Sequence, residues 1–179
     1  MRLFEKFNQV AVHPFTKVLY SNKINRVFYA TYLYNQGAIY FCLESAAAKQ
    51  GLLRGLNGLP IASKIEKDHS TLWKSRDNRP MILPVVKDYV SYVNQLAKDD
   101  PLKLWAHIYV RHGAHLSTDK WKVKTLPGQR LMHSFTNADA LRTVIESKLT
   151  PDMTDELIKC LDFEVKLLDQ MMKTGIRPT

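Results

Sequence analysis

The segment from Trp105 to Ser117 combines apolar side chains with a dense set of titratable groups. At 3.6 residues per turn, a helix through this region brings one set of side chains to a single face, namely Leu102, Trp105, Tyr109, His112 and Leu116. The phenol and the imidazole on that face lie among apolar neighbours. Such a helix is suited to form one wall of a ligand pocket.

A second candidate is His13, which follows an amphipathic segment and precedes Pro14. Proline restricts the residue before it to an extended or turn-like backbone, so we expect the helix to end here. The imidazole then has two interpretations. It caps the carbonyl groups of the helix end, or it is an axial ligand of heme iron, which requires one exposed ring nitrogen facing a flat apolar slot.

Two further histidine spacings are found in metal sites. Glu66 and His69 have the Glu-x-x-His spacing of di-iron bundles, but those sites need a second copy and two more carboxylates. We interpret this pair as a solvent-facing charge cluster with His69 turned inward. His112 and His115 are three residues apart, yet no carboxylate or thiol nearby completes a site.

Composition favours an ordinary globular chain. The 179 residues are 45% hydrophobic and 24% charged, which predicts a single domain over residues 1–179 with a substantial core. The net charge of +9 favours acidic partners or anionic ligands. The basic residues are scattered, without a basic helix, a zinc-finger spacing or an aromatic RNA-binding motif, so we do not expect nucleic acid as a partner.

The cysteine content and the hydropathy pattern bear on location. Cys42 and Cys160 both lie in apolar helical patterns, where a free thiol behaves as a small hydrophobe. Reduced thiols indicate a cytoplasmic protein. No run approaches the ~20 apolar residues that span a bilayer, and the N-terminus lacks the apolar core of a signal peptide, so no membrane association is expected.

Nearly every periodic segment has the period of a helix, which predicts an all-α fold. Asn25 is a predicted N-cap. Asp100 followed by Pro101 predicts the start of a helix, and Thr150 followed by Pro151 predicts another in the same way. Residues 118–135 lack periodicity, so we expect a loop there. The predicted helices are 3–12, about 26–49, one opened by Pro60, one after Pro84, one begun at Asp100 and one begun at Thr150 and ended by Gly175.

In their order along the chain, these segments resemble the heme oxygenase family. Lys6 and His13 are seven residues apart, as are the propionate-binding lysine and the proximal histidine of that family. No single matching segment is specific for the family, but the order in which the segments follow one another along the chain is. The other matching pieces are Tyr32-Leu33, Tyr40, Leu43-Glu44, Ile65-Glu66-Lys67-Asp68, Leu72-Trp73, Tyr109-Val110-Arg111, Leu126-Pro127-Gly128, Phe135, Arg142 and Leu149-Thr150-Pro151.

The chain departs from the family after Arg111. The family continues Tyr-x-Gly-Asp-Leu-Ser-Gly-Gly, whereas this chain reads His-Gly-Ala-His-Leu-Ser-Thr-Asp, with only Leu116 and Ser117 in register. His115 replaces the aspartate that orders water near the iron, and it carries no negative charge. It either holds a distal water or reaches the iron itself. With two histidines on the iron, oxygen has no open position and heme is stored or sensed rather than degraded.

The resemblance implies an all-α heme oxygenase-like fold that holds heme between the first helix and the 101–117 helix. It places His13 on the iron, with Lys6, Tyr109 and Arg142 at the propionates. It adds Ser117 to the heme-binding set and assigns Arg111 and His115 to the reaction.

That reaction cleaves heme to biliverdin, iron and CO, with O2 and electrons from an acidic ferredoxin, flavodoxin or flavoprotein reductase. The alternative is a heme-binding or interaction protein of the same fold that has lost the distal chemistry.

The chain also resembles thiaminase-type proteins of the same helical superfamily, through His13-Pro14-Phe15 and Tyr32-Leu33. The acidic residue of their Tyr-Leu-x-Gln-Asp-Tyr segment is replaced here by Gln36. Their nucleophilic cysteine, expected on the helix near Asp100, is also missing. A thiamine-hydrolysing activity is therefore not expected.

Overall fold

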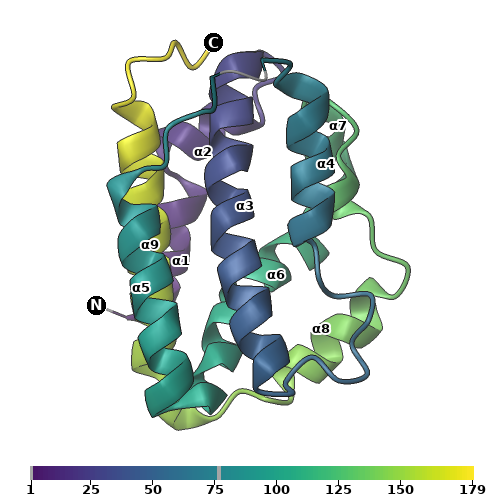
Figure 1. Ribbon diagram of the computed structural model, residues 1–179, viewed down its shortest axis with the longest axis vertical. Coiled ribbons are helices and arrows are strands. Elements are labelled where there is room, and N and C mark those ends of the chain that lie inside the picture. Colours follow the sequence, from purple (N-terminus) through teal and green to yellow (C-terminus); the bar gives the residue numbers. More distant parts are fainter. Residues whose placement is uncertain (1, 76–77) are drawn as a thin grey trace.

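The computed structural model describes residues 2–75 and 78–179, and within those ranges the regular structure is entirely helical (Figure 1), which confirms the all-α prediction. The elements are α1 (Leu3–Ala11), α2 (Pro14–Leu19), α3 (Arg26–Lys49), α4 (Ala62–Leu72), α5 (Pro84–Asp99), η1 (Pro101–Lys103), α6 (Leu104–Leu116), α7 (Lys120–Thr125), η2 (Leu131–His133), α8 (Ala138–Glu146), η3 (Pro151–Met153) and α9 (Thr154–Met172). None of these helices is long and apolar enough to cross a bilayer, as far as the described residues extend.

The central element is α3, which packs against α4 on one side, α5 on another and α6 behind it (Figure 1). Its start follows from Asn25, whose side-chain oxygen accepts hydrogen bonds from the backbone N–H groups of Val27 and Phe28 at 2.8 and 3.2 Å. Its end is followed by Gly51 at φ +72°, a backbone conformation that favours glycine. The predicted bounds of this helix are therefore confirmed.

The predicted loop over residues 118–135 is wrong in part, because it contains α7 and η2. No α7 residue is buried, so its sequence carries no apolar periodicity. The η2 turn is fixed by a distant side chain: the buried carboxylate of Asp68 on α4 accepts hydrogen bonds from the N–H groups of Leu131 and Met132 at 2.9 and 3.0 Å. Local sequence patterns do not reveal such a contact.

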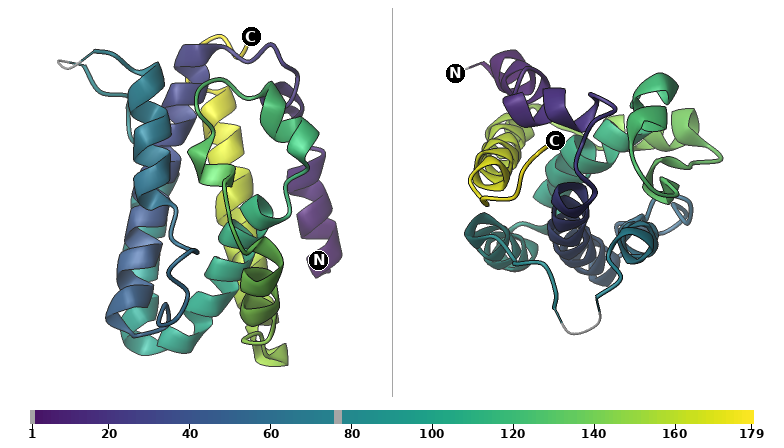
Figure 2. Two further views of the ribbon diagram at one scale, coloured as in Figure 1. Left: turned by 90° about the vertical axis from the view of Figure 1, so that its right-hand side faces the viewer. Right: turned by 90° about the horizontal axis from the view of Figure 1, so that it is seen from above.

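The first helix lies at the periphery, parallel to α9 (Figures 1 and 2). It is amphipathic, but none of its residues is fully buried, and Phe4 is 80% exposed. After a turn at His13 the chain continues as α2, a helix that the sequence analysis missed and that buries Phe15 and Leu19. The outer layer made by α1 is therefore held to the bundle through partly buried side chains, with Leu3, Phe7 and Val10 packed against the core.

A buried polar network joins α5, α6 and α9. One ring nitrogen of His107 lies 2.9 Å from the Tyr89 hydroxyl, and the other lies 2.7 Å from a carboxylate oxygen of Glu156. The same oxygen accepts a hydrogen bond from the Tyr92 hydroxyl at 2.7 Å. Burial opposes charge on His107, but Cys160 and Glu156 outweigh it and raise the pKa of His107 to about 9. His107 is thus held as an imidazolium paired with a carboxylate.

Because of this pair, we expect the free energy of unfolding to decrease as the pH rises above neutrality. The pKa of His107 rises from its ordinary value of 6.5 to about 9 on folding, so its contribution is complete below pH 6.5 and is lost as pH rises toward 9. We expect the free energy of unfolding to fall by about 3 kcal/mol across that window. Urea denaturation at pH 6 to 9 measures it. His107→Gln should flatten the slope, and an equal slope in both proteins would contradict the assignment.

Candidate functional site

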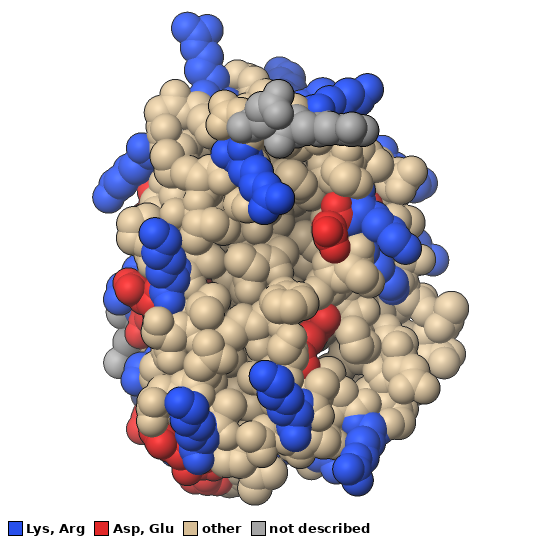
Figure 3. Space-filling model, in the orientation of Figure 1, with Lys and Arg blue, Asp and Glu red and all other residues tan. Residues whose placement is uncertain are grey.

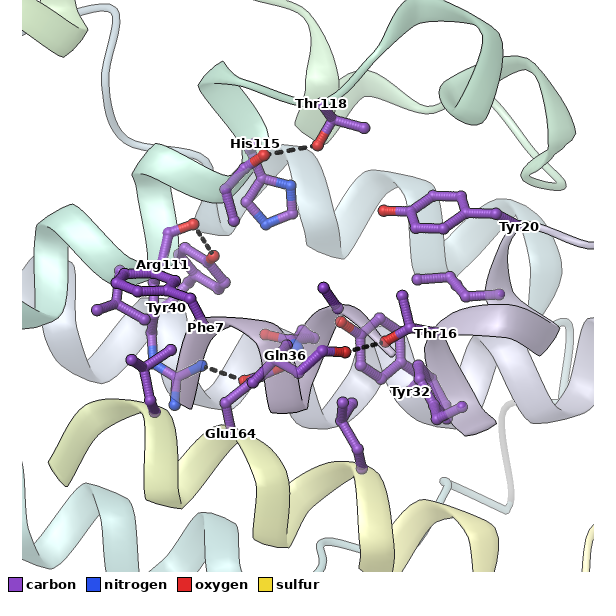
Figure 4. A pocket seen from close by; sticks show the side chains of 18 residues that line it. Phe7, Thr16, Tyr20, Tyr32, Gln36, Tyr40, Arg111, His115, Thr118 and Glu164 are labelled. Carbon is purple, nitrogen blue, oxygen red and sulfur yellow. Dashed lines mark hydrogen bonds and ion pairs between the residues drawn. The ribbon is translucent and has the colours of Figure 1, made fainter. Parts of the chain in front are cut away.

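The bundle contains a cavity of about 220 Å³ between α1 and α2 on one side and α3, α6 and α9 on the other. Aromatic rings form much of its wall (Figure 4), with Phe15 only 4.8 Å from the ring of Tyr32. From α1, the side chains that line it are Phe7, Val10 and Ala11, all apolar. The cavity therefore lies between the first helix and the helix ending at residue 116, the gap that the sequence analysis expected.

Buried polar groups form one side of this cavity. The Arg111 guanidinium donates to Glu164 at 2.8 Å and lies over the Tyr89 ring, with 4.3 Å from Cζ to the ring centroid. The Tyr40 hydroxyl donates to the backbone oxygen of Arg111 at 2.8 Å. These contacts join α3, α6 and α9, so the geometry of the cavity wall is fixed by the core (Figure 4).

His115 projects from α6 into the cavity (Figure 4). Its Nδ1 lies 3.3 Å from Nδ1 of His133 on η2, while its Nε2 has no hydrogen-bond partner among the described residues and is not sealed off from solvent. Burial, together with the nearby His133, His112 and Arg111, holds the pKa of His115 well below its usual value. The imidazole is therefore neutral at pH 7, with one nitrogen available to a ligand.

Lys6 and His13 contact α9 instead of the cavity. The Lys6 ammonium pairs with Asp162, and Nε2 of His13 lies 3.2 Å from Asp169. The second ring nitrogen, Nδ1, accepts the N–H of Phe15 at 3.1 Å, so His13 is the N-cap of α2. From the sequence, we expect both side chains to face the gap between the helices. They contact α9 instead, because Asp162 and Asp169 on that parallel helix are also seven residues apart and each meets one of them.

The remaining predicted residues lie around α6 without converging on the cavity. Tyr109 packs edge-on against Phe7, with ring centroids 6.4 Å apart. Ser117 is exposed at the C-terminal end of α6. Arg142 donates to the Leu116 carbonyl at 3.2 Å and lies 3.3 Å from Asp139. Of the predicted residues, the structure brings only Arg111 and His115 together in the cavity wall.

Among the residues that sequence reasoning missed are Tyr32, Tyr40 and Glu164, which line the cavity, and His133, which contacts His115. Glu164 had a detectable signal, since it shares the apolar face of α9 with Leu161 and Leu168, where an unpaired carboxylate is unfavourable. Tyr32 and Tyr40 belong to segments that the resemblance includes. His133 gave no signal, because it meets His115 through a contact between distant segments.

The other histidines have structural partners. His112 places Nε2 3.0 Å from Glu44, whose carboxylate also accepts the N–H groups of Ile61 and Ala62 at the start of α4. His69 packs against Trp73, with Glu66 exposed beside it. Across residues 2–75 and 78–179, no three histidine, cysteine, aspartate or glutamate side chains are placed to share a metal ion. Both cysteines are free thiols.

No protein-family model and no curated protein matches this sequence, whereas solved structures match the fold closely. Heme oxygenase-1 of the cyanobacterium Synechocystis sp. PCC6803, in complex with heme, has a TM-score of 0.81 and 17% identity, over 95% of this chain and 90% of that one. Heme oxygenase of Leptospira interrogans has a TM-score of 0.78 and 18% identity, over 93% and 94%. Heme oxygenase-2 of Synechocystis sp. PCC 6803, in complex with heme and NO, has a TM-score of 0.80 and 16% identity, over 94% and 81%. This chain therefore has the heme oxygenase-like fold.

Proposed function

We propose that this protein binds heme in the cavity between α1 and α6, with His115 as the ligand of the iron. The observation that carries the proposal is the imidazole of His115, which faces an aromatic cavity and whose Nε2 has no hydrogen-bond partner within residues 2–75 and 78–179; burial lowers the pKa of this ring well below its usual value. Iron requires an unprotonated imidazole nitrogen, and a porphyrin requires apolar walls. Heme bound there would supply the redox and gas-binding chemistry of iron.

The residues fit this group, but the cavity is small for it. A volume of about 220 Å³ lies below the 300–1,000 Å³ typical of organic ligand sites. The helix that bounds it, α1, has no fully buried residue, and its ion pair with α9 joins Lys6 to Asp162, whose side chains are 14% and 44% exposed. Partly exposed ion pairs contribute little stability, so outward movement of α1 is a way to enlarge the site.

The predicted propionate contacts stay predictions. Lys6 is paired with Asp162 and Arg142 with Asp139, so each would have to exchange a partner to meet a carboxylate of the ligand. Lys122 on α7, which is likewise paired with Asp119 at 3.4 Å, lies 5.8 Å over the ring of Tyr20, which itself lines the cavity. We therefore add Lys122 to Lys6, Tyr109, Ser117 and Arg142 as a candidate cation for a ligand carboxylate.

Cleavage of heme to biliverdin, iron and CO is the second candidate function, and the fold shared with heme oxygenases favours it. It needs O2 and electrons from a donor such as a ferredoxin, flavodoxin or flavoprotein reductase. A net charge of +9 would attract an acidic donor, although Lys and Arg are spread over the face in Figure 3 without one compact patch.

We favour binding without cleavage because the side chains that α1 presents to the cavity are all apolar, so α1 offers bound oxygen no hydrogen-bond donor. We place this function in the cytoplasm, since both cysteines are free thiols.

Titration of the purified protein with hemin tests the proposal. We expect a Soret band that saturates at one hemin per chain. Ala114→Trp fills the cavity from an exposed position on α6, so it should weaken hemin binding at least about tenfold, equivalent to 1.4 kcal/mol. Ala140→Trp, at an exposed position on α8, is the matched control and should bind as the wild type does.

A wild-type protein with no Soret band would overturn the proposal, and so would Ala114→Trp binding hemin with unchanged affinity. Adding a reductant in air to the hemin complex separates the two candidate functions. Binding alone predicts a stable heme spectrum, whereas conversion to a biliverdin spectrum would establish cleavage.

A further inference from the structure

We propose that His133 is a positioning residue that holds His115 in the tautomer with its proton on Nδ1, so that Nε2 faces the cavity as an unprotonated ligand atom. This inference rests on the proposed function and names a residue that neither the sequence analysis nor the resemblance assigned. Metal-binding histidines commonly donate their second ring N–H to a fixed acceptor, which sets both the tautomer and the ring orientation.

The geometry of the pair requires one proton between the two rings. Their Nδ1 atoms are 3.3 Å apart, and the ring centroids are 4.8 Å apart at an angle of 59°. Two protonated Nδ1 atoms at this distance would repel each other, and two unprotonated ones would leave no hydrogen bond, so one of the two carries the proton. A neutral imidazole has one donor and one acceptor nitrogen, so one ring donates Nδ1–H and the other accepts it.

Only one of the two arrangements leaves His115 able to bind iron. If His115 donates, its Nε2 carries a lone pair directed to the cavity, and His133 has its own proton on Nε2. If His133 donates, Nε2 of His115 is protonated and cannot bind a metal. The same contact therefore either prepares the ligand or blocks it.

His133 is held independently of α6. Leu131 and Met132, directly before it, donate their N–H groups to Asp68 on α4. The carbonyl of Ser134, directly after it, accepts a hydrogen bond from the ammonium group of Lys64, also on α4, at 2.6 Å. The acceptor is thus anchored on both sides, and His115 takes its orientation from it.

Tyr40 does not compete for the same proton. The centroid of its ring lies 5.4 Å from that of the His115 ring, but its hydroxyl donates a hydrogen bond to the Arg111 carbonyl at 2.8 Å. His133 is therefore the one hydrogen-bond partner of the His115 side chain among the described residues.

The direct test is nitrogen-15 NMR of the histidine side chains in the full-length, heme-free protein. His115→Gln identifies the signals of residue 115 by their loss. We expect a protonated Nδ1 and an unprotonated Nε2 in the wild type. A proton on Nε2 of His115 would overturn the inference, whatever the protein does with heme.

Two variants of His133 extend the test. His133→Asn retains an acceptor oxygen near the position of Nδ1, whereas His133→Leu removes it. We expect His133→Leu to lose the defined tautomer and to weaken hemin binding about 10- to 100-fold, and His133→Asn to remain close to the wild type in both respects. Should His133→Leu fail to fold, the wild-type tautomer and the His133→Asn variant still decide the question.

The two proposals fail in different ways. If hemin does not bind the wild type, the heme proposal fails while the tautomer of His115 is still measured. If hemin binding depends on His115 but both the tautomer and the affinity survive His133→Leu, His133 has no positioning role.

Discussion

Replacing His115 by alanine is expected to weaken hemin binding by about 100-fold, equivalent to 2.7 kcal/mol, and to abolish the spectrum of imidazole-bound iron. The reason is that, in the part of the chain that the structure describes, His115 is the histidine that lines the cavity, and its Nε2 has no hydrogen-bond partner there. Absorbance titration measures the affinity. Imidazole added to the variant should restore the ligand field, because the truncated side chain leaves room for it beside Ala114.

His13→Ala is the informative control for this prediction, since sequence resemblance assigns the iron to that residue. Both nitrogens of His13 are engaged, by Asp169 and by the Phe15 N–H. Losing the N-cap costs about 1 kcal/mol of stability, so the titration is run well below the melting temperature. We expect hemin affinity within threefold of the wild type. A loss of binding in His13→Ala with none in His115→Ala would reverse the assignment.

Replacing Arg111 by methionine is expected to destabilise the protein by about 3 to 5 kcal/mol. Arg111 is 4% exposed, and its partner Glu164 has a side chain 15% exposed, so the substitution leaves a largely buried carboxylate without its cation. It also removes the guanidinium from the face of Tyr89. For a chain of this size the melting temperature should fall by roughly 10 °C. Thermal and urea denaturation measure both quantities.

The double variant Arg111→Met with Glu164→Met separates charge from packing. It removes the unpaired carboxylate and should recover most of the lost stability, since an apolar pair of similar volume often replaces a buried ion pair at little cost. Lys103→Met is the surface control, because its pair with Asp100 is 34% and 46% exposed and should change stability by less than about 1 kcal/mol. Equal effects of Arg111→Met and Lys103→Met would show that burial does not determine the cost.

The helices could be predicted where their ends are encoded locally. Asn25 caps α3 with its own side chain, and the proline at 84 begins α5, so the chain itself specifies these boundaries. The segment with α7 and η2 could not be predicted in this way. The η2 turn depends on hydrogen bonds to the carboxylate of Asp68, which is distant in sequence. Elements held by long-range hydrogen bonds leave no periodic signal.

The site was predictable to the level of the two helices that bound it. The seven-residue spacing of Lys6 and His13 shows that both side chains share one face of the chain, but not which neighbour that face meets. Asp162 and Asp169, with the same spacing, decide the question in favour of α9. His115 was identified because it departs from the family pattern, whereas its partner His133 required the three-dimensional arrangement.

A crystal structure of the hemin complex is the most direct test of the central claim. We expect the porphyrin between α1 and α6, iron bound by Nε2 of His115, and α1 displaced outward from its present contact between Lys6 and Asp162. Iron bound by His13, or a porphyrin seated outside this cavity, would contradict it.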